Sequence, residues 1–87
     1  MKKLVEVQEV EGEGLLSLIG ERITVWCSNY IYTGKLVGVN DDCIKLENAA
    51  IVYETGAFND KEWKDAQSLP HGCYVRVAAI ESFMILK

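Results

Sequence analysis

The sequence is short of the residues that most often build catalytic and metal centres. Its 87 residues include a single histidine, His71, and three widely spaced cysteines, Cys27, Cys43 and Cys73. Zinc sites usually draw ligands from close-spaced Cys or His pairs, and nucleophilic catalysis needs a Ser or Cys beside an activating base. The sequence contains neither pattern, so we expect no metal site, no other cofactor and no enzymatic activity.

Long apolar runs and a leader segment are also lacking. A helix that spans a bilayer needs about 20 consecutive apolar residues, and no run in this chain approaches that length. An odd number of scattered cysteines without a secretory signal is typical of a reducing compartment. We therefore expect a cytoplasmic protein with no membrane partner.

Positive charge is scarce as well. The chain has nine Lys and Arg residues and 13 Asp and Glu residues, which gives a formal net charge of −4. This balance argues against a protein that coats nucleic acid mainly by charge, although it permits a local basic spot. The adjacent acids Asp41 and Asp42 predict a turn before they predict acid–base chemistry.

Apolar residues, by contrast, make up 49% of the chain. A chain of this length forms one domain, here residues 1–87, and buries roughly 60% of the surface that its unfolded form exposes. Because much of the apolar content lies in strand-like runs, some of it remains available to a partner chain. We expect an oligomer.

The pattern along the chain predicts a mainly β fold. Residues 1–14 are rich in glutamate and predict a solvated arm, although 1–10 could also form an extra edge strand. Residues 15–19 predict a short helix that Gly20 ends. Runs of β-branched and aromatic residues indicate the strands. The predicted strands are 23–28, 31–40, 43–54, 73–77 and 80–86, with a short 3-10 step at 78–79.

Residues 56–72 form the least regular segment and predict a variable excursion between the third and fourth strands. Asn59 and Glu62 fit a capping box, which would begin a helix over 60–67. A loop or a distorted hairpin tip fits the same residues. Pro70 closes the segment.

Two glycines interrupt the second predicted strand, at Gly34 and Gly38. Glycine weakens the interior of a strand, so its presence there marks a bulge, a sharp bend or the close approach of another backbone. We expect a strongly curved sheet at this point.

The chain resembles the Sm-like family. The resemblance lies in LLSLIGERITVW, YTGKLVGVNDD and VRVAAI, where Arg76 and Ile80 match the family's second motif while Val77 replaces a glycine. The short turn after the second strand is similar to that of bacterial Hfq. The resemblance implies a short N-terminal helix and five bent antiparallel strands in a small open barrel. Gly34 would then lie inside the bend, and Gly38 would relieve a second tight contact.

The family also implies an assembly. In Sm-like proteins the fourth strand of one subunit pairs with the fifth of the next, and such head-to-tail contacts close a ring. We therefore expect a homo-oligomeric ring of about five to seven subunits. The interface residues would be Tyr74, Val75, Val77, Ile80, Phe83 and Ile85. The alternative is a monomer whose strand edges are covered by the excursion or the arm.

Sm-like rings bind single-stranded RNA between the turn after the second strand and the turn before the fifth. The matching positions here are Asn40, Asp41 and Asp42 in the first turn and Arg76, Val77 and Ala78 in the second. Asp42 stands where a stacking residue is common, and the Lys-His pair of Hfq is absent. Arg76 could clamp a base or pair with one of the two acids, and Asn40 could read a base or form the turn.

Other aromatic residues offer further candidates. Lys61, Trp63 and Lys64 form the best nucleic-acid patch by composition, although the same residues suit a face packed on the sheet. Tyr30, Tyr32 and Tyr53 could stack bases away from the pore or fill the core and interface. Trp26 is expected in the core.

Two functions follow from these patterns. The first is a ring-forming Sm-like protein that binds single-stranded RNA in RNA metabolism or regulation. The second is a ring scaffold that binds protein through residues 56–72 and does not bind RNA. The sequence alone leaves both open.

Overall fold

A computed structural model describes residue 12 and residues 14–87. The predicted arm at 1–14 lies outside the described residues except for Gly12 and Gly14. The described chain folds into six antiparallel strands in one open sheet, with two 3-10 turns and no α-helix among those residues. The prediction of a mainly β fold is confirmed. No helix in the described part of the chain has the length and apolar character needed to cross a membrane.

The strands follow the predicted ones closely at the start of the chain. β3 has the bounds that the sequence predicted, and the 3-10 turn η2 lies at the predicted step. The elements are η1 (Leu15–Leu18), β1 (Arg22–Cys27), β2 (Ile31–Val39), β3 (Cys43–Glu54), β4 (Asp65–Ser68), β5 (Cys73–Arg76), η2 (Val77–Ala79) and β6 (Ile80–Met84).

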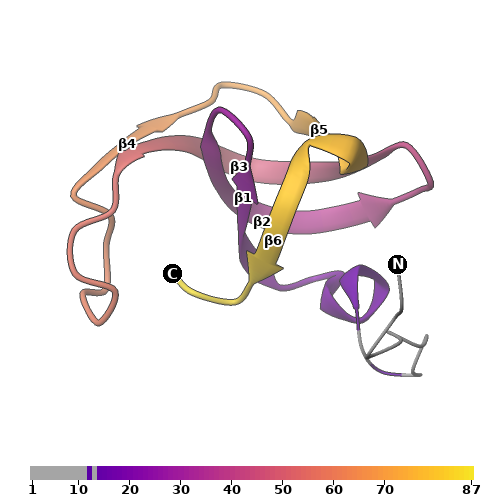
Figure 1. The fold of residues 1–87 in the computed structure, drawn as a ribbon, viewed down its shortest axis with the longest axis horizontal. Coiled ribbons are helices and arrows are strands. Elements are labelled where there is room, and N and C mark those ends of the chain that lie inside the picture. The colour runs from indigo at the N-terminus through magenta and orange to yellow at the C-terminus, as the bar shows by residue number, and fades with distance from the viewer. Residues whose placement is uncertain (1–11, 13) are drawn as a thin grey trace, which may run out of the picture.

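β3 organises the sheet because it has neighbours along both sides. The strand order is β4-β3-β2-β1-β6, and β5 also pairs with β3 (Figure 1). β5 pairs with the first half of β3, where Cys43 lies opposite Arg76. β4 pairs with the second half, where Val52 lies opposite Ala66. Within the described chain, β5 pairs with β3 alone and β6 pairs with β1 alone. Each therefore keeps one unpaired edge.

The core is built from alternate residues on four strands. Side chains two apart on a strand share a face, so Ile23 and Val25 of β1, and Ile44 and Leu46 of β3, point inward together. They pack with Leu36, Ala49 and Val75. The prediction that Trp26 belongs to the core is wrong. Trp26 follows Val25 on β1, so its side chain points to the opposite face of the strand. It is half-buried there and meets Phe58 edge-on, with ring centroids 6.1 Å apart.

The bend of the sheet lies where β2 crosses β3. Asn48 takes a left-handed conformation with φ of 49°, and the pairing register of the two strands shifts beside Gly34. A β-carbon added at Gly34 would lie 3.1 Å from the Cα of Ala49, so the close approach expected there is present. The second tight contact, expected at Gly38, is absent. A β-carbon there would find its nearest neighbour, the Cβ of Lys45, at 4.0 Å.

The predicted N-terminal helix is replaced by the shorter 3-10 turn η1. Gly14 and Gly20, which flank the segment, both have positive φ and so break a regular helix on each side. Leu15 and Leu18 pack against the core, whereas Leu16 and Ile19 remain exposed. The segment is too short to be stable as a helix alone.

The helix suggested at 60–67 is also wrong, and the strand count rises from five to six because of it. Asp65–Ser68 forms β4 instead, and the capping pair Asn59 and Glu62 begins no helix. The second half of β3 would otherwise expose unpaired backbone groups. Pairing with that edge satisfies them, and this tertiary gain outweighs a weak local helix signal.

Candidate nucleic-acid interface

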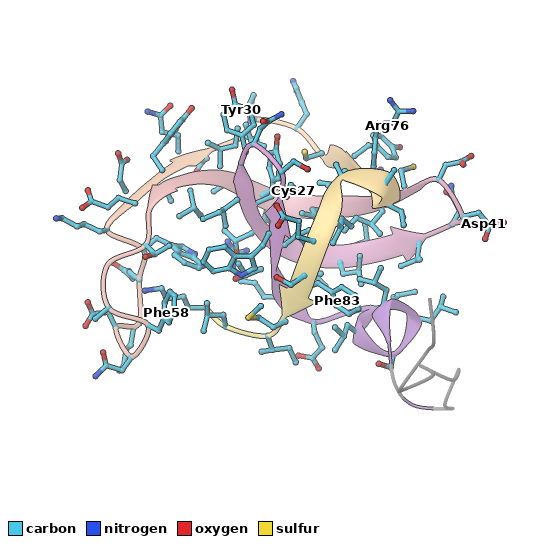
Figure 2. The ribbon with its side chains drawn as sticks, viewed as in Figure 1. Cys27, Tyr30, Asp41, Phe58, Arg76 and Phe83 are labelled. Atoms are coloured by element: carbon cyan, nitrogen blue, oxygen red, sulfur yellow. The ribbon has the colours of Figure 1, made fainter. Side chains whose placement is uncertain are left out.

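The two turns named by the sequence lie against each other. The backbone N–H of Val77 donates to the carbonyl of Asp42 at 2.8 Å, and Cys43 pairs with Arg76 across β3 and β5. Figure 2 shows Asp41 and Arg76 at the same end of the molecule. Four of the predicted RNA-binding residues, Asn40, Asp41, Asp42 and Arg76, are thus brought together.

Asn40 forms the turn between β2 and β3. Its side-chain Oδ1 accepts hydrogen bonds from the backbone N–H groups of Asp42 at 2.8 Å and Cys43 at 2.9 Å. This arrangement is the local side-chain bond by which Asn stabilises tight turns. It leaves the carboxylates of Asp41 and Asp42 exposed at the tip.

Arg76 is exposed and its charge is not neutralised by the turn. Among the described residues the one ion pair within 4.0 Å joins Lys64 to Glu54. The structural bridge from Arg76 to Asp41 or Asp42, left open by the sequence, is therefore not formed. Val77 is half-buried against the core, so it contributes little surface to the site.

The outward faces of β5 and β3 add two residues, Tyr74 and Lys45, that the sequence did not mark for binding nucleic acid. Tyr74 and Arg76 flank the buried Val75, so both point outward, and the Tyr74 side chain is 66% exposed. Lys45 pairs with Tyr74 across the strands and holds its Nζ 5.5 Å from the ring centroid. The alternation Tyr-Val-Arg on a strand beside a lysine is the signal that could have found this face.

Tyr74 lines two hollows. The first, of about 200 Å³, is lined by Tyr30, Tyr32, Cys27 and Arg76 among others. The second, of about 290 Å³, is lined by Gly38, Val39, Asn40, Cys43, Lys45 and Tyr74. Each hollow therefore has an aromatic wall and one cation, which suits a planar ligand that carries negative charge.

Cys27 and Tyr32 contribute no charge to the first hollow at physiological pH. Burial raises the pKa of the Cys27 thiol, and Glu81 and Cys73 raise it further. Burial also raises the pKa of Tyr32, and Cys73 adds to the effect. Tyr30 meets Tyr32 edge-on with ring centroids 6.4 Å apart. Because neither Cys27 nor Tyr32 ionises near neutral pH, Arg76 supplies the charge of this hollow.

The patch predicted at Lys61, Trp63 and Lys64 is divided. Lys64 Nζ lies 2.9 Å from Glu54 Oε1, while the Trp63 ring is half-buried beneath Lys87, whose Nζ lies 4.7 Å from the ring centroid. Of these three residues, Lys61 is the one that is exposed and forms no ion pair with a described carboxylate. The excursion therefore offers no open aromatic surface flanked by two free lysines.

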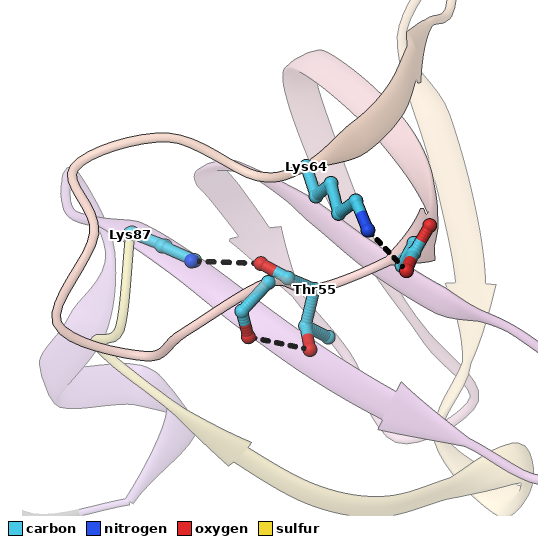
Figure 3. Close-up of polar contacts among 5 residues, drawn as sticks. Thr55, Lys64 and Lys87 are labelled. Atoms are coloured by element: carbon cyan, nitrogen blue, oxygen red, sulfur yellow. Dashed lines mark hydrogen bonds and ion pairs between the residues drawn. The ribbon is translucent and has the colours of Figure 1, made fainter.

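Lys87 closes this segment onto the sheet. Its ammonium donates to three backbone carbonyls, those of Thr55 at 2.9 Å, Ala57 at 2.8 Å and Glu62 at 3.2 Å. Figure 3 shows the bond to Thr55 and the nearby pair of Lys64 with Glu54. An ammonium has three N–H donors, so Lys87 is fully engaged as a clamp.

The predicted interface residues differ in exposure. Val75 is 5% exposed and belongs to the hydrophobic core of the chain, so its side chain is not available to a partner. Tyr74 and Ile85 are exposed, while Val77, Ile80 and Phe83 are half-buried. A partner that meets this edge would contact Tyr74 and Ile85 directly.

Comparison of the chain with family models, with curated proteins and with solved structures finds no match. Among residues 12 and 14–87, no three His, Cys, Asp or Glu side chains come together as a metal site. The features gathered at this end of the described chain are the cations Arg76 and Lys45, the tyrosines of the two hollows and the acidic turn.

Proposed function

We propose that the protein is a Sm-like subunit that assembles head-to-tail into a ring and binds single-stranded RNA in RNA metabolism or regulation. The observation that carries the proposal is the contact between the two turns. Asp42 accepts the 2.8 Å bond from Val77, beside Arg76, whose guanidinium forms no ion pair with a described carboxylate. In Sm-like proteins these two turns hold the base.

The strand order supports the assembly. If β4 is treated as part of the excursion, five strands remain, and β5 and β6 lie at opposite edges of the open sheet, joined through η2. Edge strands with free N–H and C=O groups readily pair with another chain. Exposed Tyr74 on β5 and exposed Ile85 just after β6 suit such a contact.

RNA is the favoured ligand because the site joins cations to exposed aromatic rings. Guanidinium groups bind phosphate and stack on bases, and tyrosine rings accept bases of any sequence. Arg76 and Lys45 form no ion pair with a described carboxylate, so both are free to meet phosphate.

Binding of fluorescein-labelled hexauridylate and hexaadenylate, followed by anisotropy, tests the RNA function. We expect binding that weakens between about 20 mM and about 200 mM salt, because phosphate contacts release counterions. Arg76→Ala should weaken it, and Lys35→Ala, an equal charge change at an exposed site on β2, should weaken it less. Absence of binding at the lower salt concentration would overturn the RNA proposal.

A ring scaffold that binds protein is the second candidate, and β4 favours it. All four residues of β4 are exposed, and its outer edge is unpaired within the described chain. An extended peptide can add to such an edge through main-chain hydrogen bonds. A ring that forms in solution but binds neither oligonucleotide would favour the protein-binding scaffold.

A further inference from the structure

We propose further that the hollow over Gly38 is a base-binding subsite, in which one RNA base stacks on Tyr74 while Lys45 and Arg76 hold the flanking phosphates. The inference rests on the proposed RNA function. It assigns the base to the outward face of β3 and β5, away from the tip of the acidic turn. Lys45, Tyr74 and Gly38 thereby gain a role that neither turn motif gave them.

Gly38 is the first reason for this assignment. Its φ lies outside the left-handed region, so the backbone does not require glycine there. Packing does not require it either, because a β-carbon would come no closer than 4.0 Å to another atom. What the missing side chain does leave is open space, since Gly38 lines the hollow of about 290 Å³.

Tyr74 is the second reason. Its ring forms a wall of this hollow, and the side chain is 66% exposed although its neighbour Val75 is buried. The pairing of β5 with β3 fixes the position of the ring, because Tyr74 lies opposite Lys45 in register. A ring that is both exposed and held on a strand is a ready platform for stacking.

The charges supply the third reason. The exposed carboxylates of Asp41 and Asp42 repel phosphate from the tip of the turn. Lys45 and Arg76 attract it to the adjacent face, and neither cation is neutralised by a described carboxylate. Nucleic acid that approaches this end is therefore directed from the turn onto β3 and β5.

The same anisotropy titration, with hexauridylate and hexaadenylate at about 20 mM salt, tests the subsite. Tyr74→Leu should weaken binding at least about fivefold, because base stacking is lost, whereas Tyr74→Phe should bind as the wild type does. Gly38→Val, which fills the hollow, should weaken binding by a similar factor. Lys45→Met should weaken it more than Lys35→Met, the matched loss of one exposed lysine on β2.

Circular dichroism and native mass are measured for each variant, because Tyr74 also lies at the proposed subunit contact. Gly38 lies away from both unpaired edges, so Gly38→Val separates loss of the hollow from loss of assembly. If Arg76→Ala weakens binding while Tyr74→Leu and Gly38→Val bind normally, the subsite is overturned and the RNA function stands. If the wild type binds neither oligonucleotide, both proposals fall together.

Discussion

A β-carbon added to Gly34 would lie 3.1 Å from the α-carbon of Ala49, across the bend between β2 and β3. The carbonyl oxygen of Glu47 would lie equally close. Backbone atoms move aside less readily than a flexible side chain, so the bend favours glycine at this position. Gly38, four residues along the same strand, has no such neighbour.

The two glycines should therefore respond differently to the same change. We expect Gly34→Ala to lower the free energy of unfolding by about 1–3 kcal/mol, the usual cost of overpacking. Gly38→Ala should leave stability unchanged or raise it by up to about 1 kcal/mol, because alanine restricts the unfolded chain. Urea denaturation of both variants measures this, and equal losses would contradict the account of the bend.

The clamp of Lys87 predicts a loss of stability that centres on the excursion. Lys87→Met removes three charge-assisted hydrogen bonds to backbone carbonyls and the contact with Trp63. We expect the free energy of unfolding to fall by about 1–3 kcal/mol. Hydrogen exchange of residues 55–64 should quicken, and Trp63 fluorescence should shift toward that of a solvated indole.

Lys64→Met is the matched control for this clamp. Lys64 also makes a 2.9 Å bond, but both partners of its pair with Glu54 are largely exposed. Exposed ion pairs contribute little to stability, so this variant should unfold as the wild type does. If Lys64→Met lowers the free energy of unfolding as much as Lys87→Met does, the hydrogen bonds of Lys87 to the three backbone carbonyls are not what holds the excursion.

Two substitutions of Asn40 separate the stability of the turn from its proposed role in RNA binding. Asn40→Asp keeps the oxygen that accepts from the N–H groups of Asp42 and Cys43, so stability should be retained. Asn40→Leu removes the acceptor and should cost about 1–3 kcal/mol. The aspartate adds a third carboxylate to the turn and should weaken RNA binding at low salt. Thermal denaturation and anisotropy together distinguish the two effects.

The half-buried thiols of Cys27 and Cys73 predict a loss of stability in mild alkali. Burial raises the pKa of Cys27 and of Cys73 above the ordinary value of 9.0. The folded state therefore keeps these protons at a pH where the unfolded state has released them. Their contribution is fully present below pH 9.0 and is lost as the pH rises through the folded-state pKa values.

Urea denaturation between about pH 8 and about pH 10 measures this dependence. The double variant Cys27→Ala and Cys73→Ala should show a shallower decline than the wild type, whatever its stability at neutral pH. Tyr32, whose pKa burial also raises, accounts for part of the slope that remains near its ordinary value of 10.0. An unchanged slope in the double variant would exclude the thiols as its cause.

The proposed ring predicts a position-specific effect of surface charge. Ile85→Glu places a carboxylate at a residue that is 60% exposed beside the free edge of β6. We expect native mass spectrometry to find an assembly of several subunits for the wild type and monomers for this variant. Leu16→Glu, at a residue 63% exposed on η1, should leave the mass unchanged. A monomeric wild type would contradict the ring.

Strands were predicted well from the sequence because their signal is local. β3 has the predicted bounds, since Cys43–Glu54 is rich in β-branched and apolar residues and begins after an acidic turn. The suggested helix over 60–67 was wrong because its capping signal is weak and the free edge of β3 offered better hydrogen bonds. β4 has no strand pattern of its own, so no reading of Asp65–Ser68 alone would find it.

The candidate site was predicted in part. The sequence named Arg76 and the turn at Asn40, but it could not decide whether Arg76 was neutralised, because that depends on side-chain distances. It favoured Lys61, Trp63 and Lys64 for their composition, and the fold engages two of these three elsewhere. Lys45 was missed because its neighbour Tyr74 lies 29 positions away in the sequence.

The sequence by itself determined the class of fold, the turn at Asn40 and the need for glycine in the bent strand. These properties depend on backbone conformation and on alternation of side chains, which short stretches encode. Only the tertiary structure decided which residues meet across strands. The pairing of β5 with β3 set Tyr74 beside Lys45, placed Arg76 where it meets no described carboxylate, and left Gly38 in the lining of a hollow. Register between distant strands is set by burial of the whole core, and no single segment carries it.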